Sequence, residues 1–140
     1  APYFEEISTL ILNTFKKEYK TIDELAVESI FNTCKYLELD TNFVRSSSIY
    51  DNSEKKSQER VIDICKKEAA KIYVNPIGGQ ALYNQQEFQF SGIDLYFIKS
   101  KYVEYKQYNN QFIPNLSIID VLMFNSKKDT SSMLNNYELI

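Results

Sequence analysis

The chain has 140 residues and a formal net charge of -3; 44% of its residues are hydrophobic and 25% are charged. A chain of this length can bury a sizeable core, and the composition is that of a globular protein rather than a disordered tail. It contains no histidine, which excludes Ser-His and Cys-His nucleophile pairs and a His-ligated zinc site within these residues. The charge balance is mildly acidic and the lysines are scattered, so no nucleic-acid-binding face is expected.

The spacing of apolar residues predicts helices through much of the first half of the chain. Apolar residues recur every three or four positions, which is the period of one helix face. Thr21 followed by Glu24 is typical of a capping box at the start of the second helix. A short run around Phe43 and Val44 has the residue types of a strand. Helices are predicted over 4–19, 22–37 and 58–71, and a strand is predicted over 42–47.

Turn residues divide the second half of the chain into shorter elements. Gly78-Gly79 forces a turn after a β-rich run, and Gly92 is placed to end the helix that follows. Ser117 and Asp120 indicate another capping box, on a helix that is apolar nearly all round and is therefore expected to be buried. Strands are predicted over 72–74 and 93–98, helices over 81–90 and 117–124, a tyrosine-rich connection over 102–112, and a polar tail from 125 with a helical stretch near Met133.

This order of elements predicts the fold class. Strand, helix, strand, helix, strand at this spacing is typical of Rossmann-like βαβ units, so we expect an α/β fold with a small, mostly parallel sheet and flanking helices. One domain is expected over 1–140. Three short strands make a small sheet, and the chain begins at Ala1 without a methionine, so we expect it to be a fragment of a larger domain.

Two further observations concern the environment of the protein. Two cysteines, Cys34 and Cys65, are too few for a disulfide scaffold, and we expect two reduced core thiols in a cytoplasmic protein. Apolar runs such as Val121 to Phe124 are far shorter than the roughly 20 residues that span a bilayer, so no transmembrane segment is predicted. The sequence does not indicate which oligomeric state the protein adopts.

Arg45, Ser46 and Ser47 form the first candidate binding site. They end the first predicted strand, and open α/β sheets bind ligands beyond the carboxyl ends of their strands. A guanidinium beside hydroxyl groups could hold a phosphate or a sugar carboxylate. The alternative is a polar loop with an ordinary exposed arginine.

The second candidate lies at the start of the helix predicted over 58–71. Glu59 and Asp63 are four residues apart on one helix face, beside Gln58 and Arg60, and could hold Mg²⁺ or act as acid and base. The alternative is a solvated helix face on which Arg60 is paired locally. No metal site is otherwise indicated, and the sequence does not identify a cofactor.

Asn75, Gly78 and Gly79 are the third candidate, directly after the second predicted strand. Two glycines leave backbone N–H groups open at a turn, which suits an anion or a carbonyl oxygen. The segment is neither a P-loop nor a dinucleotide fingerprint. A tight turn between strand and helix is the alternative.

The remaining candidates lie near the C-terminus. Tyr102, Tyr105 and Phe112, with the amide of Gln107, could stack on a sugar or a base, or could simply cover a sheet edge. Asp120 is the one charged residue in its apolar segment. It could cap its helix, or it could face the sheet and act as a general base.

Four stretches resemble the WbqC-like protein family: APYFEEI, SQERVIDICKKEAAKIYVNPIGGQALY, FSGIDLYFIK and EYKQYNNQFIPNLSIIDVLMFN. They occur in the order and spacing of the family, and family members carry a further N-terminal portion, so the chain resembles the C-terminal part of such a protein. The positions that match the family pattern are Arg45, Ser46, Ser47, Gln58, Glu59, Arg60, Asp63, Asn75, Pro76, Gly78, Gly79, Tyr105, Gln107, Phe112, Pro114, Ser117 and Asp120.

The resemblance implies a role in bacterial surface polysaccharide assembly, including the O-antigen of lipopolysaccharide. We therefore expect group transfer onto a nucleotide-activated or lipid-linked sugar. Arg45 and Arg60 would bind its phosphates, the glycine turn would donate N–H groups, and Glu59, Asp63 or Asp120 would act as base. A non-catalytic binding or scaffold module, and a generic nucleotide-binding α/β domain, are the alternatives.

Overall fold

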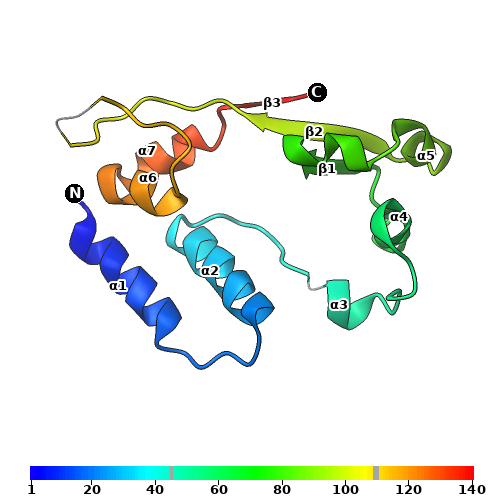
Figure 1. Ribbon diagram of the computed structural model, residues 1–140, viewed down its shortest axis with the longest axis horizontal. Coiled ribbons are helices and arrows are strands. Elements are labelled where there is room, and N and C mark those ends of the chain that lie inside the picture. Colours follow the sequence, from blue (N-terminus) through cyan, green and yellow to red (C-terminus); the bar gives the residue numbers. More distant parts are fainter. Residues whose placement is uncertain (45, 109–110) are drawn as a thin grey trace. The chain divides into compact units, whose positions relative to one another are not determined.

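A computed structural model of the protein describes residues 1–44, 46–108 and 111–140 (Figure 1). The chain divides into two compact units, each built from segments that are separate in sequence. Unit 1 joins residues 1–43 to 102–136, and unit 2 joins residues 44–101 to 137–140.

Unit 1 is helical. Its helices are α1 (Phe4–Phe15), α2 (Ile22–Tyr36), α6 (Ile118–Phe124) and α7 (Lys127–Met133). Helix α1 contacts both α2 and α6, and α7 contacts α6. The core consists of Ile7, Leu37 and Leu122, which are buried where these helices meet. Helix α6 is less buried than its all-round apolar character predicts, since Ile118 and Ile119 stay 37% and 40% exposed.

The helix starts of unit 1 match the sequence signals only in part. Ser117 caps α6 as predicted, with its Oγ accepting from the N–H of Ile119, whereas Asp120 does not complete the box. Glu24 accepts from the N–H of Lys20, but Thr21 makes no capping bond at α2. The Glu24 carboxylate therefore bonds the backbone just before its helix, whereas the Asp120 carboxylate bonds side chains 13 and 15 residues away in sequence.

Unit 2 contains a three-stranded mixed sheet in the order β1-β2-β3. Its elements are α3 (Ser46–Ile49), α4 (Ser57–Lys67), β1 (Ile72–Pro76), the 3₁₀ helix η1 (Ile77–Leu82), α5 (Gln85–Phe90), β2 (Asp94–Ser100) and β3 (Tyr137–Leu139). Strands β1 and β2 are parallel and are joined by η1 and α5, as in a βαβ unit, whereas β3 pairs antiparallel with β2. The predicted α/β class, with a small sheet and flanking helices, is confirmed.

One predicted strand is wrong. Residues 42–44 have no regular structure, and α3 begins directly after position 45. The Phe43 ring instead packs edge-on against Phe31 of α2, with 5.8 Å between the ring centroids. The third strand of the sheet comes from residues 137–139, in the segment that was expected to be a polar tail. A run of three residues with one partly buried position, which is the charged Glu138, carries too weak a pattern to indicate a strand.

The core of unit 2 lies on one face of the sheet. Alternate residues of β2, Leu95 and Phe97, are buried together with Phe88 of α5 and Cys65 of α4. The Phe88 ring stacks on Tyr73 with 5.6 Å between the ring centroids. Cys65 is buried, and burial raises the pKa of its thiol.

Cys34, in unit 1, is partly buried. Both thiols are free, and the prediction of a core position is confirmed for Cys65 but not for Cys34.

Several helices end in the same backbone motif. After α5, the N–H of Ile93 reaches the carbonyl of Phe88, and Gly92 takes a left-handed φ of 71°. The equivalent position after α4 is Ala69, with a φ of 52°. An alanine gives no sequence signal for this kind of helix end. The predicted helix therefore extended to Lys71, whereas α4 ends at Lys67.

Other boundaries also differ from the expected ones. Helix α1 ends at Phe15, earlier than predicted. The helix predicted over 81–90 is divided, because the side chain of Asn84 accepts from the N–H of Gln86 and so starts α5 anew. No helix within the described residues is both long and apolar enough to cross a membrane.

The two left-handed positions give a matched prediction. We expect Ala69→Gly to raise the free energy of unfolding by about 1 kcal/mol, because glycine adopts a positive φ without steric cost, and Gly92→Ala to lower it by a similar amount. Urea unfolding of both variants measures the two shifts. Equal and negligible shifts would show that neither helix end is held in this conformation.

Candidate functional site

An open, polar hollow of about 680 Å³ lies in unit 2. One wall is the start of α4, over residues 56–59, and the other is the end of η1 and the turn after it, over residues 81–84. Six of its eight lining residues carry polar side chains: Lys56, Ser57, Gln58, Glu59, Tyr83 and Asn84. The hollow therefore offers an ammonium group, hydroxyls, amides and a carboxylate to one ligand.

The two walls of the hollow are joined by Gln58. Its Oε1 accepts a hydrogen bond from the N–H of Asn84 at 2.9 Å. Asn84 in turn caps α5, so this bond ties the start of α4 to the start of α5. The predicted binding residue Gln58 thus lies in the hollow and also shapes it.

Ser57 and Lys56 make the start of α4 unusual. Ser57 has a φ of 47°, in the left-handed region, which costs of order 1 kcal/mol for a residue with a Cβ. Lys56 occupies the N-cap position without a capping side-chain bond. Backbone strain of this kind gathers at binding sites.

Glu59 is the exposed carboxylate of the hollow. It lies in the first turn of α4, where the helix dipole favours negative charge. It forms no ion pair with any residue in the described part of the chain. No described cation therefore occupies its oxygens.

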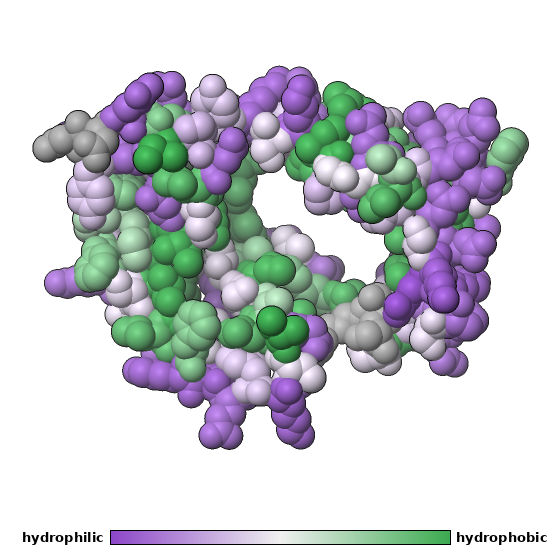
Figure 2. Space-filling view, in the orientation of Figure 1, coloured by the Kyte–Doolittle hydropathy of each residue, from purple (hydrophilic) through white to green (hydrophobic). Residues whose placement is uncertain are grey.

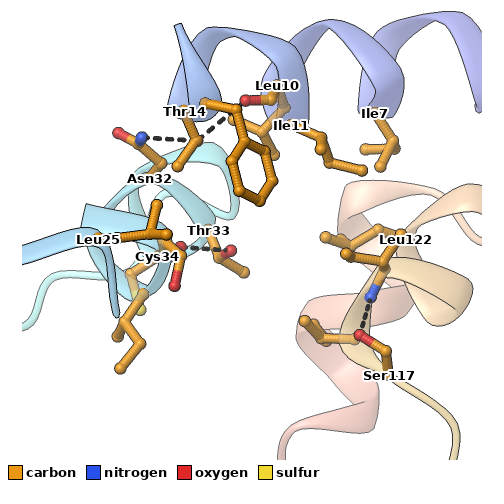
Figure 3. A pocket seen from close by; sticks show the side chains of 15 residues that line it. Ile7, Leu10, Ile11, Thr14, Leu25, Asn32, Thr33, Cys34, Ser117 and Leu122 are labelled. Atoms are coloured by element: carbon orange, nitrogen blue, oxygen red, sulfur yellow. Dashed lines mark hydrogen bonds between the residues drawn. The ribbon is translucent and has the colours of Figure 1, made fainter. Parts of the chain in front are cut away.

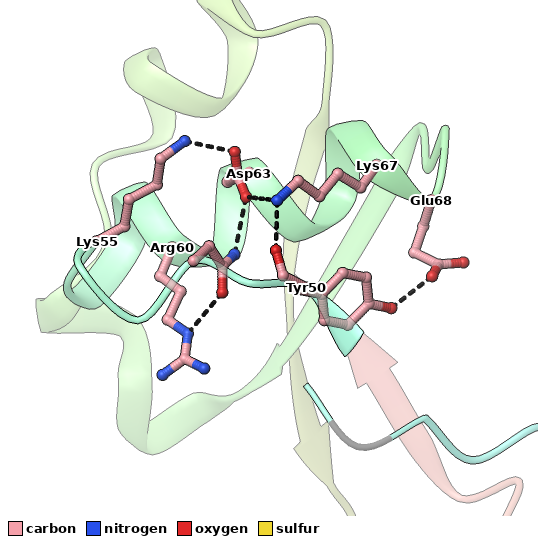
Figure 4. Close-up of polar contacts among 7 residues, drawn as sticks. Tyr50, Lys55, Arg60, Asp63, Lys67 and Glu68 are labelled. Atoms are coloured by element: carbon pink, nitrogen blue, oxygen red, sulfur yellow. Dashed lines mark hydrogen bonds and ion pairs between the residues drawn. The ribbon is translucent and has the colours of Figure 1, made fainter. Parts of the chain in front are cut away.

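Asp63, by contrast, is held by its neighbours (Figure 4). One oxygen pairs with the ammonium group of Lys55; the other accepts from Asn52 at 2.8 Å and pairs with Lys67 at 3.0 Å. The hydrogen bonds from Lys55, Asn52 and Lys67 hold the pKa of Asp63 well below its usual range. Both oxygens are thus used within the protein, which gives Asp63 a structural part rather than a free acid-base group.

Asn52 links this carboxylate to Arg60. It is 1% exposed, and its Oδ1 accepts from Nε of Arg60 at 3.1 Å. Arg60 is thus paired locally, as one of the two interpretations predicted, while its terminal nitrogens point away from the network in Figure 4. No sequence pattern marks Asn52, because one asparagine in a polar stretch has the same pattern whether it is buried or exposed.

Tyr50 completes the attachment of residues 50–55 to α4 (Figure 4). Its carbonyl accepts from Lys67, and its hydroxyl donates to the carboxylate of Glu68. The hydrogen bond to Glu68, together with desolvation, raises the pKa of Tyr50 to about 12.

Asn75 and Gly79 fit together at the end of β1. The amide of Asn75 donates to the hydroxyl of Tyr73 at 2.6 Å and to that of Tyr83 at 3.5 Å. Burial is the main reason that the pKa of Tyr73 is raised to about 12. A Cβ added at Gly79 would lie 2.2 Å from Oδ1 of Asn75, whereas one added at Gly78 would meet nothing within 4 Å. A side chain at position 79 would therefore force the Asn75 amide to move.

Asp120 forms hydrogen bonds with two other predicted residues of unit 1, Tyr105 and Gln107. Its Oδ2 accepts from the hydroxyl of Tyr105 at 2.6 Å and from Nε2 of Gln107 at 3.0 Å. The Gln107 amide also bonds both backbone groups of Ile113, accepting at 2.9 Å and donating at 3.1 Å. The Tyr105 ring packs edge-on against Phe112 at 5.2 Å. Burial and the bond to Asp120 raise the pKa of Tyr105. Asp120 thus holds the connection between β2 and α6.

A model of the WbqC-like protein family matches residues 1–132. The chain belongs to the WbqC-like protein family. The match covers nearly the whole chain and does not by itself mark it as the C-terminal part of a longer protein. A search of curated proteins and a search of solved structures found no match.

The candidate residues of this WbqC-like chain fall into separate groups. Unit 1 contains two of them, Gln107 and Asp120. Unit 2 contains Gln58, Glu59, Arg60, Asp63, Asn75, Gly78 and Gly79. Arg45 lies outside the described residues, as do the side chains of Ser46 and Ser47, so the phosphate site at 45–47 stays a prediction. Within the described ranges, no group of three or more cysteine, aspartate and glutamate side chains could hold a metal ion.

The two adjacent glycines give a direct test of the Asn75 packing. We expect Gly79→Ala to lower the free energy of unfolding by about 1–3 kcal/mol, because its Cβ displaces the Asn75 amide, and Gly78→Ala to have a much smaller effect. Urea unfolding of the two variants measures the difference. If Gly79→Ala costs as much in an Asn75→Ala background, the clash is not the cause.

Asp63 predicts how stability depends on pH. Because its folded pKa is lowered from the usual 3.8, its contribution is present above that value and is lost as the pH falls toward the lowered pKa. We expect Asp63→Asn to be less stable than wild type near neutrality and to lose less stability on acidification. Urea unfolding over a pH series measures this, with the exposed Asp94→Asn as control. Parallel curves for wild type and Asp63→Asn would contradict the ion-pair role.

Proposed function

We propose that this WbqC-like chain acts in bacterial surface polysaccharide assembly, including that of lipopolysaccharide O-antigen, by binding an activated sugar in the polar hollow of unit 2. Membership of the WbqC-like family supports the general role. The observation that most supports sugar binding is the composition of the hollow, in which the exposed carboxylate of Glu59 lies among hydroxyl, amide and ammonium groups.

The composition of the hollow suits a sugar. Sugar hydroxyls both donate and accept hydrogen bonds, so a matching wall needs acceptors as well as donors. Glu59 accepts only, Lys56 donates only, and Ser57 and Tyr83 do both. The Tyr83 ring adds an apolar surface on which a sugar face can pack.

The reaction we propose is group transfer onto a hydroxyl of the bound sugar. Glu59 accepts the hydroxyl proton as the sugar oxygen bonds to the electrophilic carbon of the transferred group. The bond from that carbon to its donor breaks, and the donor leaves with the electron pair. Arg60, held at Nε by Asn52, would use its terminal nitrogens on the diphosphate of a nucleotide- or lipid-linked sugar, together with Arg45.

A non-catalytic binding or scaffold module is the second candidate. Tyr102 and Tyr108 are 65% and 67% exposed in unit 1, which favours an aromatic contact surface there. Tyr105 is a poor probe of such a surface, because its hydroxyl is bonded to Asp120. A generic nucleotide-binding domain has less support, since the packing of Asn75 already accounts for Gly79.

A thermal-shift screen against nucleotide sugars tests the enzyme proposal. We expect at least one nucleotide sugar to raise the melting temperature of wild type, and Gln58→Ala to abolish that shift because it opens the hollow. Glu59→Gln should keep the shift but lower group transfer about 100-fold or more, as expected for loss of a general base. Glu54→Gln, an exposed carboxylate outside the hollow, is the matched control.

Two results would count against the proposal. One is the absence of stabilisation by any nucleotide sugar, with activity unchanged in Arg60→Ala. The other is loss of partner capture in Tyr102→Ala while Glu59→Gln and Asp120→Asn behave as wild type, which would favour the scaffold.

A further inference from the structure

Unit 1 contains a pocket of about 480 Å³ that sequence reasoning did not identify. Three helices form it: α1 provides the roof, and α2 and α6 provide opposite walls (Figure 3). Ile7 and Ile11 extend from α1 toward the pocket, with Ile7 above Leu122 of α6, while Cys34 lies on the opposite side on α2 (Figure 3). All of these residues belong to the same compact unit.

The lining of this pocket has no ionisable side chain apart from the Cys34 thiol. No aspartate, glutamate, lysine or arginine is among its fifteen residues, and nine of the fifteen are aliphatic or phenylalanine. An ion transferred into such a site would lose its hydration without gaining a partner charge. The pocket therefore selects against charged ligands.

The polar groups of the wall are already bonded to one another. Oγ1 of Thr14, a residue 5% exposed, accepts from the amide of Asn32 at 2.9 Å and donates to the carbonyl of Leu10 at 3.0 Å. Thr33 donates to the carbonyl of Ser29 at 2.8 Å. Few polar atoms remain to bind a ligand that needs hydrogen bonds, so binding here depends on apolar contact.

The pocket opens through exposed apolar residues. Phe15 is 65% exposed and Ile30 is 55% exposed, and both line it. Hydrophobic residues gather over α1 and α2 in the space-filling view (Figure 2). Covering such surface is favourable by about 25 cal/mol per Å² of apolar area removed from water.

We propose that this pocket binds a single uncharged aliphatic chain, such as that of a medium-chain fatty alcohol. The volume lies within the range of small-molecule sites, and the uncharged, apolar wall matches the chemistry of such a chain. The inference is independent of the proposed function, because the hollow containing Glu59 belongs to the other unit.

The two cysteines of the chain allow a local test. Cys34 lines the pocket, whereas Cys65 is 6% exposed in the core of unit 2. In a Cys65→Ala background, we expect 1-decanol to slow the alkylation of Cys34 by a maleimide severalfold and to raise the melting temperature. In a Cys34→Ala background, 1-decanol should leave the alkylation of Cys65 unchanged.

A pair of substitutions on α2 tests the specificity of binding. Ile30→Glu places a charge at the mouth of the pocket and should weaken the protection of Cys34 by 1-decanol at least fivefold. Ile22→Glu is the matched control, since Ile22 lies on the same helix, is 86% exposed and does not line the pocket. Both positions are exposed, so both variants should fold.

Three outcomes would overturn the proposal. If 1-decanol does not affect the alkylation of Cys34, the aliphatic chain of the alcohol does not enter the pocket. Protection that rises with protein concentration in the absence of 1-decanol assigns the pocket to a second copy. Protection by phosphatidylcholine vesicles but not by dissolved 1-decanol assigns it to a membrane surface.

Discussion

The buried amide of Asn52 bonds Asp63 on one side and Arg60 on the other, and so fixes the segment before α4 on that helix. Side-chain amides hold other irregular segments in the same way. Gln58 bonds the N–H of Asn84 and so joins the start of α4 to the start of α5. Asn75 donates to the hydroxyls of Tyr73 and Tyr83. Gln107 bonds both backbone groups of Ile113 and so closes the loop between them. Fully buried apolar side chains are few among the described residues, so these hydrogen bonds are expected to contribute a larger share of the order of the fold.

This use of amides explains which parts of the candidate site could be predicted. Sequence reasoning selected Gln58 for its place beside Glu59, Asn75 for its place before the glycine turn, and Gln107 for its amide among the tyrosines. In the structure each of them bonds within its own unit. Residue type reveals the capacity to form hydrogen bonds, but the partner depends on contacts between residues far apart in sequence. Asp63 and Glu59 illustrate the same point, since they share one helix but only Asp63 is bonded by Asn52 and paired with two lysines.

The fold was predictable where local signals agree. Helices α1, α2 and α4, the strand at β2 and the glycine that ends α5 follow from periodicity and turn chemistry. The third strand was not predictable, because its position depends on pairing with β2 across some forty residues of chain. The apolar pocket was missed because an amphipathic face has the same pattern whether a neighbouring helix covers it fully or in part.

The chain passes between the two units three times, near residues 43, 101 and 136. A single cut therefore cannot release either unit intact. The same connectivity orders events during synthesis from the N-terminus. Helices α1 and α2 are made before β1 and β2, whereas α6, which completes the core of α1 and α2, is made only after those strands. The edge strand β3 is made after α6 and α7. Each unit is therefore completed only after part of the other has been made, and the apolar face of α1 stays uncovered until α6 has been made.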